Sequence, residues 1–253
     1  MIKFFRKIRQ NLLMENKTGK YFKYAIGEIV LVVIGILIAL QINNWNENRK
    51  INKEELQLIE SLHKEFTYNK NELERSIKRA QLIQKRCETI LNNTGNREMK
   101  LSKIESDSLI NWGLTSIITY DPSNGILENI ISSGKIQIIK NEKLKNLLSS
   151  WNGFLNDVKE DETWAVNERN QFIFPFLYKN SNYISITNGG KQNSQIASGF
   201  DADYKEVYKL LEFENLVNSQ RIWNRKNERN YKNLKRSIDE IIALCQQEIS
   251  LKK

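Results

Sequence analysis

The longest apolar stretch of the chain runs from Tyr24 to Ile42 and has the sequence YAIGEIVLVVIGILIALQI. Within its nineteen residues, only Glu28 and Gln41 are strongly polar. At about 1.5 Å of rise per residue, a helix over this stretch is roughly 28 Å long, which matches the hydrocarbon thickness of a bilayer. The pattern therefore predicts a single transmembrane helix over residues 24–42.

The residues that flank this stretch indicate its orientation. Residues 1–23 contain seven basic residues and one acidic residue, and so account for +6 of the formal net charge of +9. Basic flanks stay on the cytoplasmic side of a membrane, and aromatic residues such as Tyr24 and Trp45 favour its two borders. We therefore expect residues 1–23 in the cytoplasm and residues 43–253 on the other side of the membrane.

The amino-terminal segment leaves two alternatives open. Residues 1–14 place apolar side chains at three- and four-residue spacing, which is typical of a helix lying in a membrane interface, but a loosely ordered basic segment would also set the topology. A cleaved signal peptide also begins with basic residues followed by an apolar run. Here the run is longer than the usual signal core, and Gln41 stands where cleavage requires a small residue. We therefore expect an uncleaved anchor.

One face of the predicted transmembrane helix carries Glu28, Gly35 and Ala39. Small residues let two helices approach closely, and a carboxyl group that faces a partner helix costs less than one that faces lipid. These three residues are therefore a candidate packing face for a homodimer. In the alternative, Glu28 only extends toward Lys23 and the lipid headgroups.

Beyond the anchor, residues 50–91 contain no glycine or proline, and apolar residues recur every seven positions. This spacing predicts a helix of roughly 60 Å with a coiled-coil-like seam. Asn69 and Ser76 interrupt the seam, which we interpret as a partly exposed face, although polar seam residues can also fix register. The apolar seam residues are Ile59, Phe66, Leu73, Ala80 and Cys87.

Cap residues predict where the next two helices begin. Ser102 and Glu105 have the spacing of a capping box, which would open a helix that extends toward Tyr120. Asp121 followed by Pro122 is typical of a further helix start, with the aspartate as cap and the proline in the first turn. We expect a glycine at position 134 to close that helix.

The middle of the chain predicts another long helix of the same bundle. Residues 135–140 fit an extended connector or a helical turn better than a strand, because no partner strand is evident. Asn141 is a cap for the following helix, and Pro175 should kink or end it. Its predicted seam again repeats at seven and contains Leu144, Trp151, Val158, Ala165 and Phe172.

The carboxyl-terminal part predicts a loop and two helices. Residues 180–198 are rich in Asn, Ser and Gly and are expected to form an exposed loop. Asp201 or Asp203 would restart a helix through Leu216, and a last helix is expected over residues 219–251. With only two prolines and eleven glycines in the chain, the fold is expected to be mainly α: an amino-terminal transmembrane helix followed by an elongated antiparallel helical bundle.

The distribution of charge and of cysteine narrows the possible partners. Most of the positive charge flanks the anchor, which fits contact with anionic lipid better than a groove for phosphates, so we expect a lipid bilayer and no nucleic acid as partner.

Cys87, Cys245 and His63 form no zinc motif. We expect two free thiols, although export would permit a disulfide. Four tryptophans are expected in the core rather than around a ligand: Trp112, Trp151, Trp164 and Trp223.

The densest ionisable group of the chain is Glu160, Asp161, Glu162, Glu168 and Arg169. Paired carboxylates of this kind can bind a divalent cation or act as acid and base, but an internal ion pair or a solvated face explains them more simply. The chain contains no nucleotide-binding, serine-hydrolase or zinc-protease motif. We therefore predict no catalytic residue, cofactor or metal ligand.

The run from Lys20 to Lys50, KYFKYAIGEIVLVVIGILIALQINNWNENRK, and the upstream MIKFFRKIRQNLL closely resemble the anchor of an uncharacterised family of membrane proteins from Bacteroidota, a domain of unknown function. Residues 127–148 resemble this family more loosely. The resemblance implies a single-pass inner-membrane protein with a helical domain in the periplasm, and it implies no catalytic residue.

These observations favour a non-enzymatic membrane protein. A long amphipathic helix beyond an anchor suggests a bundle that binds a protein partner, associates as a homodimer or serves as an accessory subunit of the cell envelope. The alternative is a sensor that binds a small ligand between its helices. About 23 cytoplasmic residues cannot form an output domain, so such a sensor would need a separate signalling partner.

Overall fold

The computed structural model describes Met14, residues 18–189 and residues 196–252, and the regular elements of these residues are all helical. The prediction of a mainly α fold is therefore confirmed. The interfacial helix predicted over residues 1–14 lies outside the described residues, apart from Met14. In chain order the elements are α2 (Thr18–Leu91), α3 (Lys103–Leu109), η1 (Ile110–Leu114), α4 (Gly125–Ser132), η2 (Lys135–Ile138), α5 (Glu142–Glu168), η3 (Arg169–Ile173), α6 (Phe174–Asn180), α7 (Tyr183–Thr187), η4 (Glu206–Lys209) and α8 (Leu211–Lys252).

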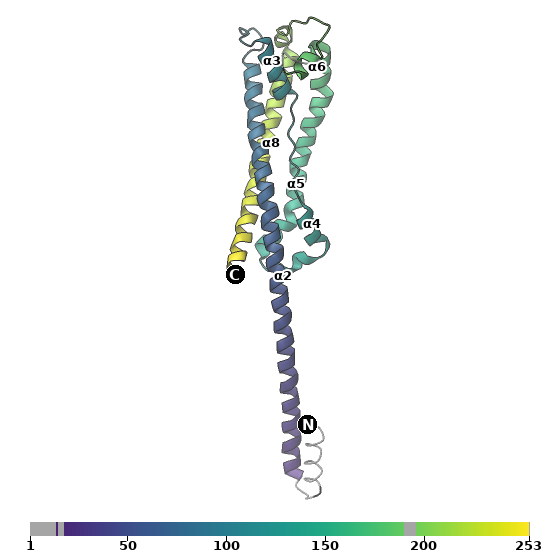
Figure 1. Ribbon diagram of the computed structural model, residues 1–253, viewed down its shortest axis with the longest axis vertical. Coiled ribbons are helices and arrows are strands. Elements are labelled where there is room, and N and C mark those ends of the chain that lie inside the picture. The colour runs from purple at the N-terminus through teal and green to yellow at the C-terminus, as the bar shows by residue number, and fades with distance from the viewer. Residues whose placement is uncertain (1–13, 15–17, 190–195, 253) are drawn as a thin grey trace. The chain divides into compact units, whose positions relative to one another are not determined.

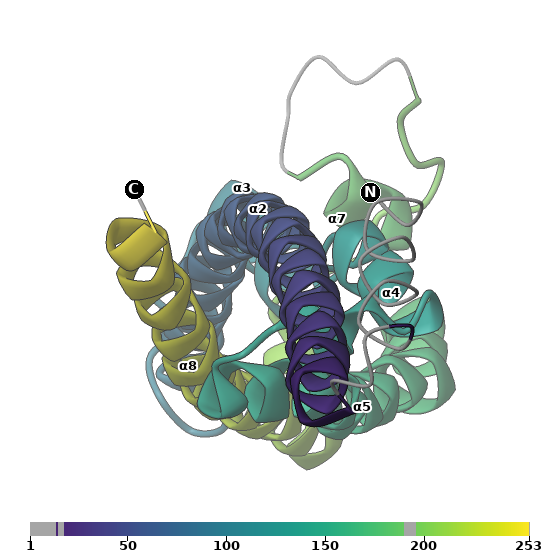
Figure 2. The same cartoon turned by 90° about the horizontal axis from the view of Figure 1, so that it is seen from below.

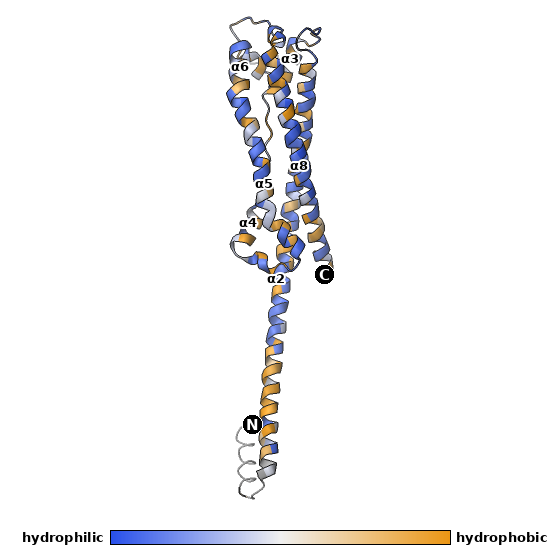
Figure 3. Ribbon diagram, turned by 180° about the vertical axis from the view of Figure 1, so that it is seen from behind, coloured by the Kyte–Doolittle hydropathy of each residue, from blue (hydrophilic) through white to orange (hydrophobic). Residues whose placement is uncertain are grey.

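The chain divides into two compact units, Met1–Leu56 and Gln57–Lys253, and α2 contributes residues to both. In the first unit, every side chain from Ile29 to Lys53 is exposed. Figure 3 shows that apolar residues dominate the lower part of this helix and that polar residues follow toward the bundle. In the part of the chain that the structure describes, α2 is the one helix long and apolar enough to cross a membrane. Its length and composition are compatible with a single-pass membrane protein.

The second unit is built on three long helices: residues 57–91 of α2, α5 and α8 (Figure 1). Residue pairs along α2 and α8 run in opposite directions, since Lys70 contacts Asp239 at 2.6 Å and Arg221 contacts Glu88 at 3.8 Å. α8 also runs antiparallel to α5, so α2 and α5 are parallel to each other. Figure 2 shows these helices end-on.

The heptad pattern of residues 57–91 is confirmed by burial. Its apolar seam residues, Ile59, Phe66, Leu73, Ala80 and Cys87, all lie in one continuous core. The interpretation of Asn69 and Ser76 as part of an exposed face is wrong, because both are buried. Asn69 exchanges two hydrogen bonds with the Ser123 backbone, 2.7 and 2.8 Å long, and these bonds satisfy its amide inside the bundle.

The seam of the α5 region is correct up to Ala165 and wrong at Phe172, which is 57% exposed. The reason is η3, a π-helical turn in which the Phe174 N–H donates to the Arg169 carbonyl five residues back. Such a turn contains one extra residue and shifts the following side chains around the helix. Ile173 therefore takes the buried position. Pro175 lies in the first turn of α6, where a proline is tolerated because the missing N–H has no intrahelical partner.

The helix expected from Ser102 to Tyr120 begins as predicted, with a complete Ser102–Glu105 capping box, but it ends at Leu114. Residues Thr115–Asn124, which we call the connector, are not helical. In Figure 1 the connector runs between α2 and α8 on one side and α5 on the other. The predicted Asp121–Pro122 helix start is therefore wrong, since both residues belong to the connector.

The remaining boundaries differ in detail. Gly134 closes α4 with a φ of 74°, and Asn141 caps α5 by accepting from the Leu144 N–H at 3.0 Å, both as predicted. The helix predicted to begin at Asp201 or Asp203 is wrong, because α8 begins only at Leu211 and continues unbroken to Lys252. Within the predicted loop 180–198, α7 buries Ile186, while residues 190–195 lie outside the described part.

Candidate functional site

The connector brings the backbone groups of Ile118 and Tyr120 into the bundle interior, where water cannot satisfy them, and leaves its other residues partly or fully exposed. Side chains from the three long helices replace the missing partners. Gln220 donates to the Ser116 carbonyl at 2.6 Å, and Tyr231 donates to the Ile118 carbonyl at 3.2 Å. At the far end, Asn69 pairs with the Ser123 backbone. The buried polar residues of the bundle therefore hold the connector in place.

Glu162 is the central member of this network and is only 4% exposed. One of its oxygens, Oε1, accepts from the Tyr120 N–H at 2.9 Å and from the Tyr231 hydroxyl at 2.6 Å. Burial raises the pKa of the Glu162 carboxyl, and these two hydrogen bonds oppose that rise. Burial, followed by the charge of Glu162, raises the pKa of Tyr231 as well. Both shifts favour the protonated form of the group relative to the same side chain in water.

Glu65 likewise supplies hydrogen-bond acceptors for backbone N–H groups at the start of α4. Its buried carboxylate accepts from the Ile126 N–H at 2.9 Å and from the Leu127 N–H at 3.0 Å. The local residue at the cap position, Asn124, makes no capping hydrogen bond and instead accepts from the Trp151 indole N–H at 3.0 Å. A side chain that lies about sixty positions earlier in the sequence thus caps this helix.

The predicted ionisable cluster is divided among separate environments. Asp161 pairs with Lys226 at 2.6 Å and accepts from the Asn230 amide at 2.6 Å. Glu168 accepts hydrogen bonds from the Ser219 hydroxyl and the Trp223 indole N–H. All three carboxylates contact α8, but Glu162 is buried in the core, where it also binds the connector, while Asp161 and Glu168 lie nearer the surface.

Arg169 lies apart from these carboxylates. Its guanidinium group contacts the Phe174 ring at 5.1 Å and donates to the Asn170 side chain at 3.2 Å. Among the described residues, no three His, Cys, Asp or Glu side chains come together in a way that could hold a metal ion. Asp161, Glu162 and Glu168 instead have hydrogen-bond partners on neighbouring elements, which fits the interpretation of internal pairing.

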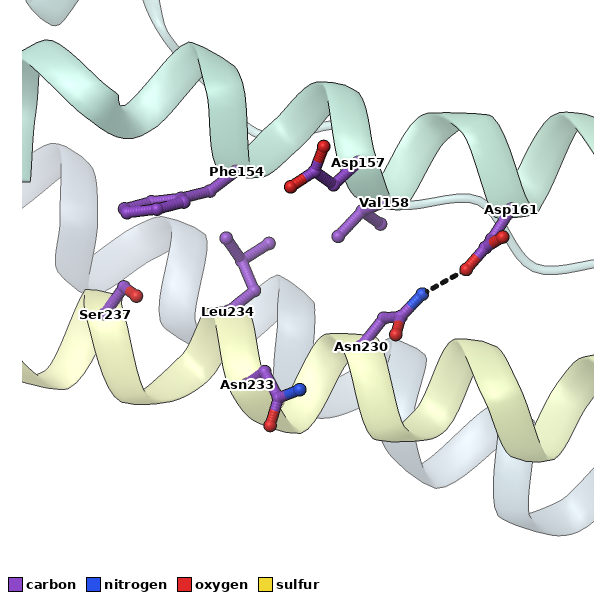
Figure 4. Close-up of a pocket in the computed structure, with 8 residues that line it drawn as sticks. All are labelled: Phe154, Asp157, Val158, Asp161, Asn230, Asn233, Leu234 and Ser237. Atoms are coloured by element: carbon purple, nitrogen blue, oxygen red, sulfur yellow. Dashed lines mark hydrogen bonds between the residues drawn. The ribbon is translucent and has the colours of Figure 1, made fainter.

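An open groove lies between α5 and α8 and has a volume of 360 Å³. Figure 4 shows Phe154, Val158 and Leu234 along its floor and polar side chains around them, with Asn230 directed at Asp161. The polar lining also includes Asp157, Asn233 and Ser237. The groove offers carboxylates, carboxamides and an apolar floor, which suits a small ligand with hydrogen-bond donors.

The two cysteines are buried free thiols, as expected. Burial raises the pKa of each thiol to about 12, so neither is a ready nucleophile. His63 is half-buried on α2. Of the four tryptophans predicted to be core, only Trp151 is fully buried; Trp112 and Trp164 are 54% and 63% exposed, which corrects that prediction.

Exposed apolar side chains gather where α5 and η3 meet the start of α8. Trp164, Phe172 and Leu211 are 63%, 57% and 72% exposed, and we call them the aromatic patch. Phe172 and Leu211 line one open hollow with Glu168, and Trp164, eight residues before Phe172, lines a second hollow with Lys159 and Glu160. Sequence periodicity missed this patch, because it assigned Trp164 and Phe172 to the core.

The predicted transmembrane packing face lies in the first unit. Ala39 is exposed, and Gly35 has open space where a Cβ would lie. Glu28 is half-buried. The face is thus accessible along α2, and dimerisation through it remains a prediction.

Comparison with known proteins gives one match. A family model described as a family of unknown function, DUF6090, matches residues 28–154, which is half of the chain. No curated protein and no solved structure matches the chain. The matched range begins inside the apolar stretch of α2 and ends in α5, so it includes the connector and the Glu65 cap. The chain therefore belongs to the DUF6090 family of unknown function.

Proposed function

We propose that this protein is a non-enzymatic, single-pass inner-membrane protein whose periplasmic bundle binds a protein partner. In this proposal residues 1–23 lie in the cytoplasm, residues 24–42 cross the membrane and the bundle lies outside, as in the membrane proteins of Bacteroidota that the anchor resembles. The charge asymmetry around the apolar stretch supports the orientation. The bundle then serves as an adaptor or accessory subunit of the envelope.

The aromatic patch is the observation that carries partner binding. Exposed Trp and Phe side chains are enriched at the energetic centres of protein interfaces, and an apolar group on an otherwise polar surface costs free energy until a partner covers it. Trp164, Phe172 and Leu211 flank Glu168, whose oxygens already accept from α8. The patch is therefore an exposed apolar surface on helices that hydrogen bonds join to each other.

Site-specific photo-crosslinking tests the proposal. A photoreactive amino acid replaces Phe172 in the full chain, expressed at native level in its host, and adducts are identified by mass spectrometry. A single protein adduct that disappears with Trp164→Ala supports the proposal. The matched control is Tyr68→Ala, which removes another aromatic side chain, 55% exposed, from α2. If no protein adduct forms, or if both variants weaken it equally, the proposal is wrong.

Topology needs its own experiment. Single cysteines introduced at positions 10 and 250, in a chain with Cys87→Ala and Cys245→Ala, are treated with a membrane-impermeant maleimide in intact spheroplasts. We expect labelling at position 250 and none at position 10. The reverse pattern, or labelling of both, would contradict the proposed orientation.

The groove between α5 and α8 supports a second candidate, a sensor for a small cationic ligand. Its lining presents Asp157 and Asp161 above an apolar floor. The test is a thermal-shift assay of the full chain in detergent with spermidine. A saturable rise in Tm that Asp157→Asn removes supports the sensor, and an unchanged Tm argues against this ligand class.

A further inference from the structure

One side of the bundle carries an excess of positive charge in its middle third. Residues 75–86 of α2 contain five basic residues and no acidic residue. Residues 221–236 of α8 contain seven basic residues and a single acidic residue, Glu228. The amides of Gln81 and Gln84 each donate to Glu228 at 2.8 Å, so these two segments lie at the same level of the antiparallel pair.

The exposed basic residues form two rows. On α8, the row recurs at intervals of four, three and four residues, which places it on one helical face: Arg225, Arg229, Lys232 and Arg236. On α2, Arg75, Lys78 and Lys85 are exposed at matching spacing. Each row is about 16 Å long at the helical rise of 1.5 Å per residue. We call the two rows together the basic band.

Arg221, Lys226 and Lys235 of α8, which lie outside the band, form ion pairs within the chain. Of the seven residues of the band, only two form an ion pair with another described residue. Arg75 pairs with Glu72 at 2.5 Å and Lys232 pairs with Glu228 at 2.6 Å, both on their own helices. In the part of the chain that the structure describes, no ion pair involves Lys78, Lys85, Arg225, Arg229 or Arg236. Like charges three or four residues apart on a helix repel each other by a few tenths of a kcal/mol per pair. The band therefore carries a local excess of positive charge that a negatively charged partner would complement.

We propose that the basic band docks an acidic helical segment of a protein partner. Two exposed aliphatic residues accompany the basic rows: Leu82 on α2 is 46% exposed, and Ile222 on α8 is 51% exposed. An amphipathic helix laid along α2 and α8 would cover these side chains with its apolar stripe and place flanking carboxylates on both rows. Phosphate backbones offer nothing comparable to Leu82 and Ile222, so the combination favours a protein over a nucleic acid.

A second copy of this chain is a poor occupant. Residues 151–168 of α5 contain five acidic residues, but three of them are already engaged within the chain. Glu162 is buried, Asp161 pairs with Lys226, and Glu168 accepts from α8. The remaining Asp157 and Glu160 are accompanied by the exposed Lys159. A copy could thus offer only a small excess of negative charge.

A peptide-binding assay tests the docking of an acidic helix. The full chain in detergent is titrated against a fluorescent Leu/Ala/Glu peptide whose glutamates flank a leucine stripe at helical spacing. A second peptide of identical composition distributes the glutamates evenly around the helix. We expect the patterned peptide to bind about tenfold more tightly than the permuted one, with affinity falling as salt rises.

Matched charge reversals locate the interaction. We expect Arg225→Glu with Arg229→Glu to weaken binding of the patterned peptide about tenfold or more. The control, Lys159→Glu with Lys179→Glu, changes net charge equally at exposed positions outside the band and should leave the affinity unchanged. Circular dichroism of both double variants verifies that the bundle is folded.

Several outcomes would overturn the proposal. Equal binding of the two peptides would show that only bulk charge matters, and equal weakening by both double variants would show that the band is not the site. Stronger binding to phosphatidylglycerol vesicles or to a DNA duplex than to the patterned peptide would assign the band to a lipid surface or a nucleic acid. The band does not depend on the aromatic patch, so either proposal can fail without the other.

Discussion

The connector and the basic band differ in how their polar groups are satisfied: side chains of the bundle satisfy the first, and solvent satisfies the second. Inside, the connector's backbone groups meet matched side chains, among them Glu162, Tyr231, Gln220 and Asn69. Outside, five basic side chains of the band lack an ion-pair partner within the described residues. Interior polar groups must be satisfied for the chain to fold, whereas exposed charges are satisfied by water.

Substitutions in the two regions should therefore have different effects: those in the connector network should change stability, and those in the basic band should change binding. Changes to the interior network should lower the free energy of unfolding, because each lost partner leaves a buried donor or acceptor unsatisfied. Changes to the band should leave stability intact and alter only what binds. The following variants test this separation in the full chain, from the largest expected effect to the smallest.

Glu162→Ala should be the most damaging single change. It removes the shared acceptor of the Tyr120 N–H and the Tyr231 hydroxyl, which leaves the buried Tyr120 N–H unpaired and the hydroxyl with only the longer hydrogen bond to the Ile118 carbonyl. We expect a loss of about 2–4 kcal/mol, measured by urea unfolding in detergent. Glu160→Ala, on the exposed side of α5, is the control and should change stability by less than about 0.5 kcal/mol. Equal losses in the two variants would contradict the assigned role of Glu162.

Glu65→Ala should remove the cap of α4. The Ile126 and Leu127 N–H groups lose their acceptor, for an expected cost of about 1–3 kcal/mol. Glu65→Gln retains one carboxamide oxygen and should recover part of this loss. Hydrogen exchange at the two amides measures the cap directly. Unchanged protection of both amides in Glu65→Ala would show that the cap is dispensable.

Gly113→Ala and Gly153→Ala should shift stability in opposite directions. A Cβ at position 113, where η1 leads into the connector, would lie 2.9 Å from the Arg86 Cβ, and such overpacking costs about 1–3 kcal/mol. Gly153 lies in α5 with open space around it, so alanine there should gain about 0.5–1 kcal/mol. Thermal unfolding compares the two, and a stabilising Gly113→Ala would contradict the close approach.

The pH dependence of stability should reveal the raised pKa of Glu162. Its raised pKa means that the folded protein holds this proton more tightly than the unfolded chain, so the stabilisation present at low pH is lost as pH rises through the folded-state pKa. Glu162→Gln keeps an oxygen for both donors and never ionises. The Tm of this variant should therefore gain on the wild type as the pH rises above the ordinary pKa of a glutamate. A constant difference would contradict the raised pKa.

Arg225→Gln with Arg229→Gln should have the smallest effect on stability. Neither arginine has an ion pair in the described part of the chain, and removing like-charge neighbours should change stability by no more than a few tenths of a kcal/mol. A loss above about 1 kcal/mol, seen by the same urea unfolding, would mean that the band is structural rather than a docking surface.

Local signals in the chain predicted much of the fold. The seam from Ile59 to Cys87, the Ser102–Glu105 capping box and the Asn141 cap depend on residues within one or two turns of each other, and all are present. The failures have longer-range causes. Phe172 left the seam because η3 inserts a residue, and α8 continued past the predicted break because packing outweighs local propensity.

The candidate site was only partly predictable for the same reason. Asp161, Glu162 and Glu168 were selected because they cluster in sequence, yet each has a different environment. Glu65 and Gln220 gave no signal at all, since a single polar residue on a helix is ordinarily exposed. Asn69 on the seam was the one available hint, because a polar residue at a core position requires a partner.

By itself, the sequence determined the helical class, the stretch from Tyr24 to Ile42 and the apolar faces that form the core, because these depend on periodicity and composition. Only the tertiary structure decided the environment of Glu162, whose partners Tyr120 and Tyr231 lie 42 and 69 positions away. It also decided which basic residues share one surface, because α2 and α8 meet only when the chain folds. Contacts between distant residues cannot be predicted from spacing along one helix. Such contacts hold the connector in place and bring together the two rows of the basic band.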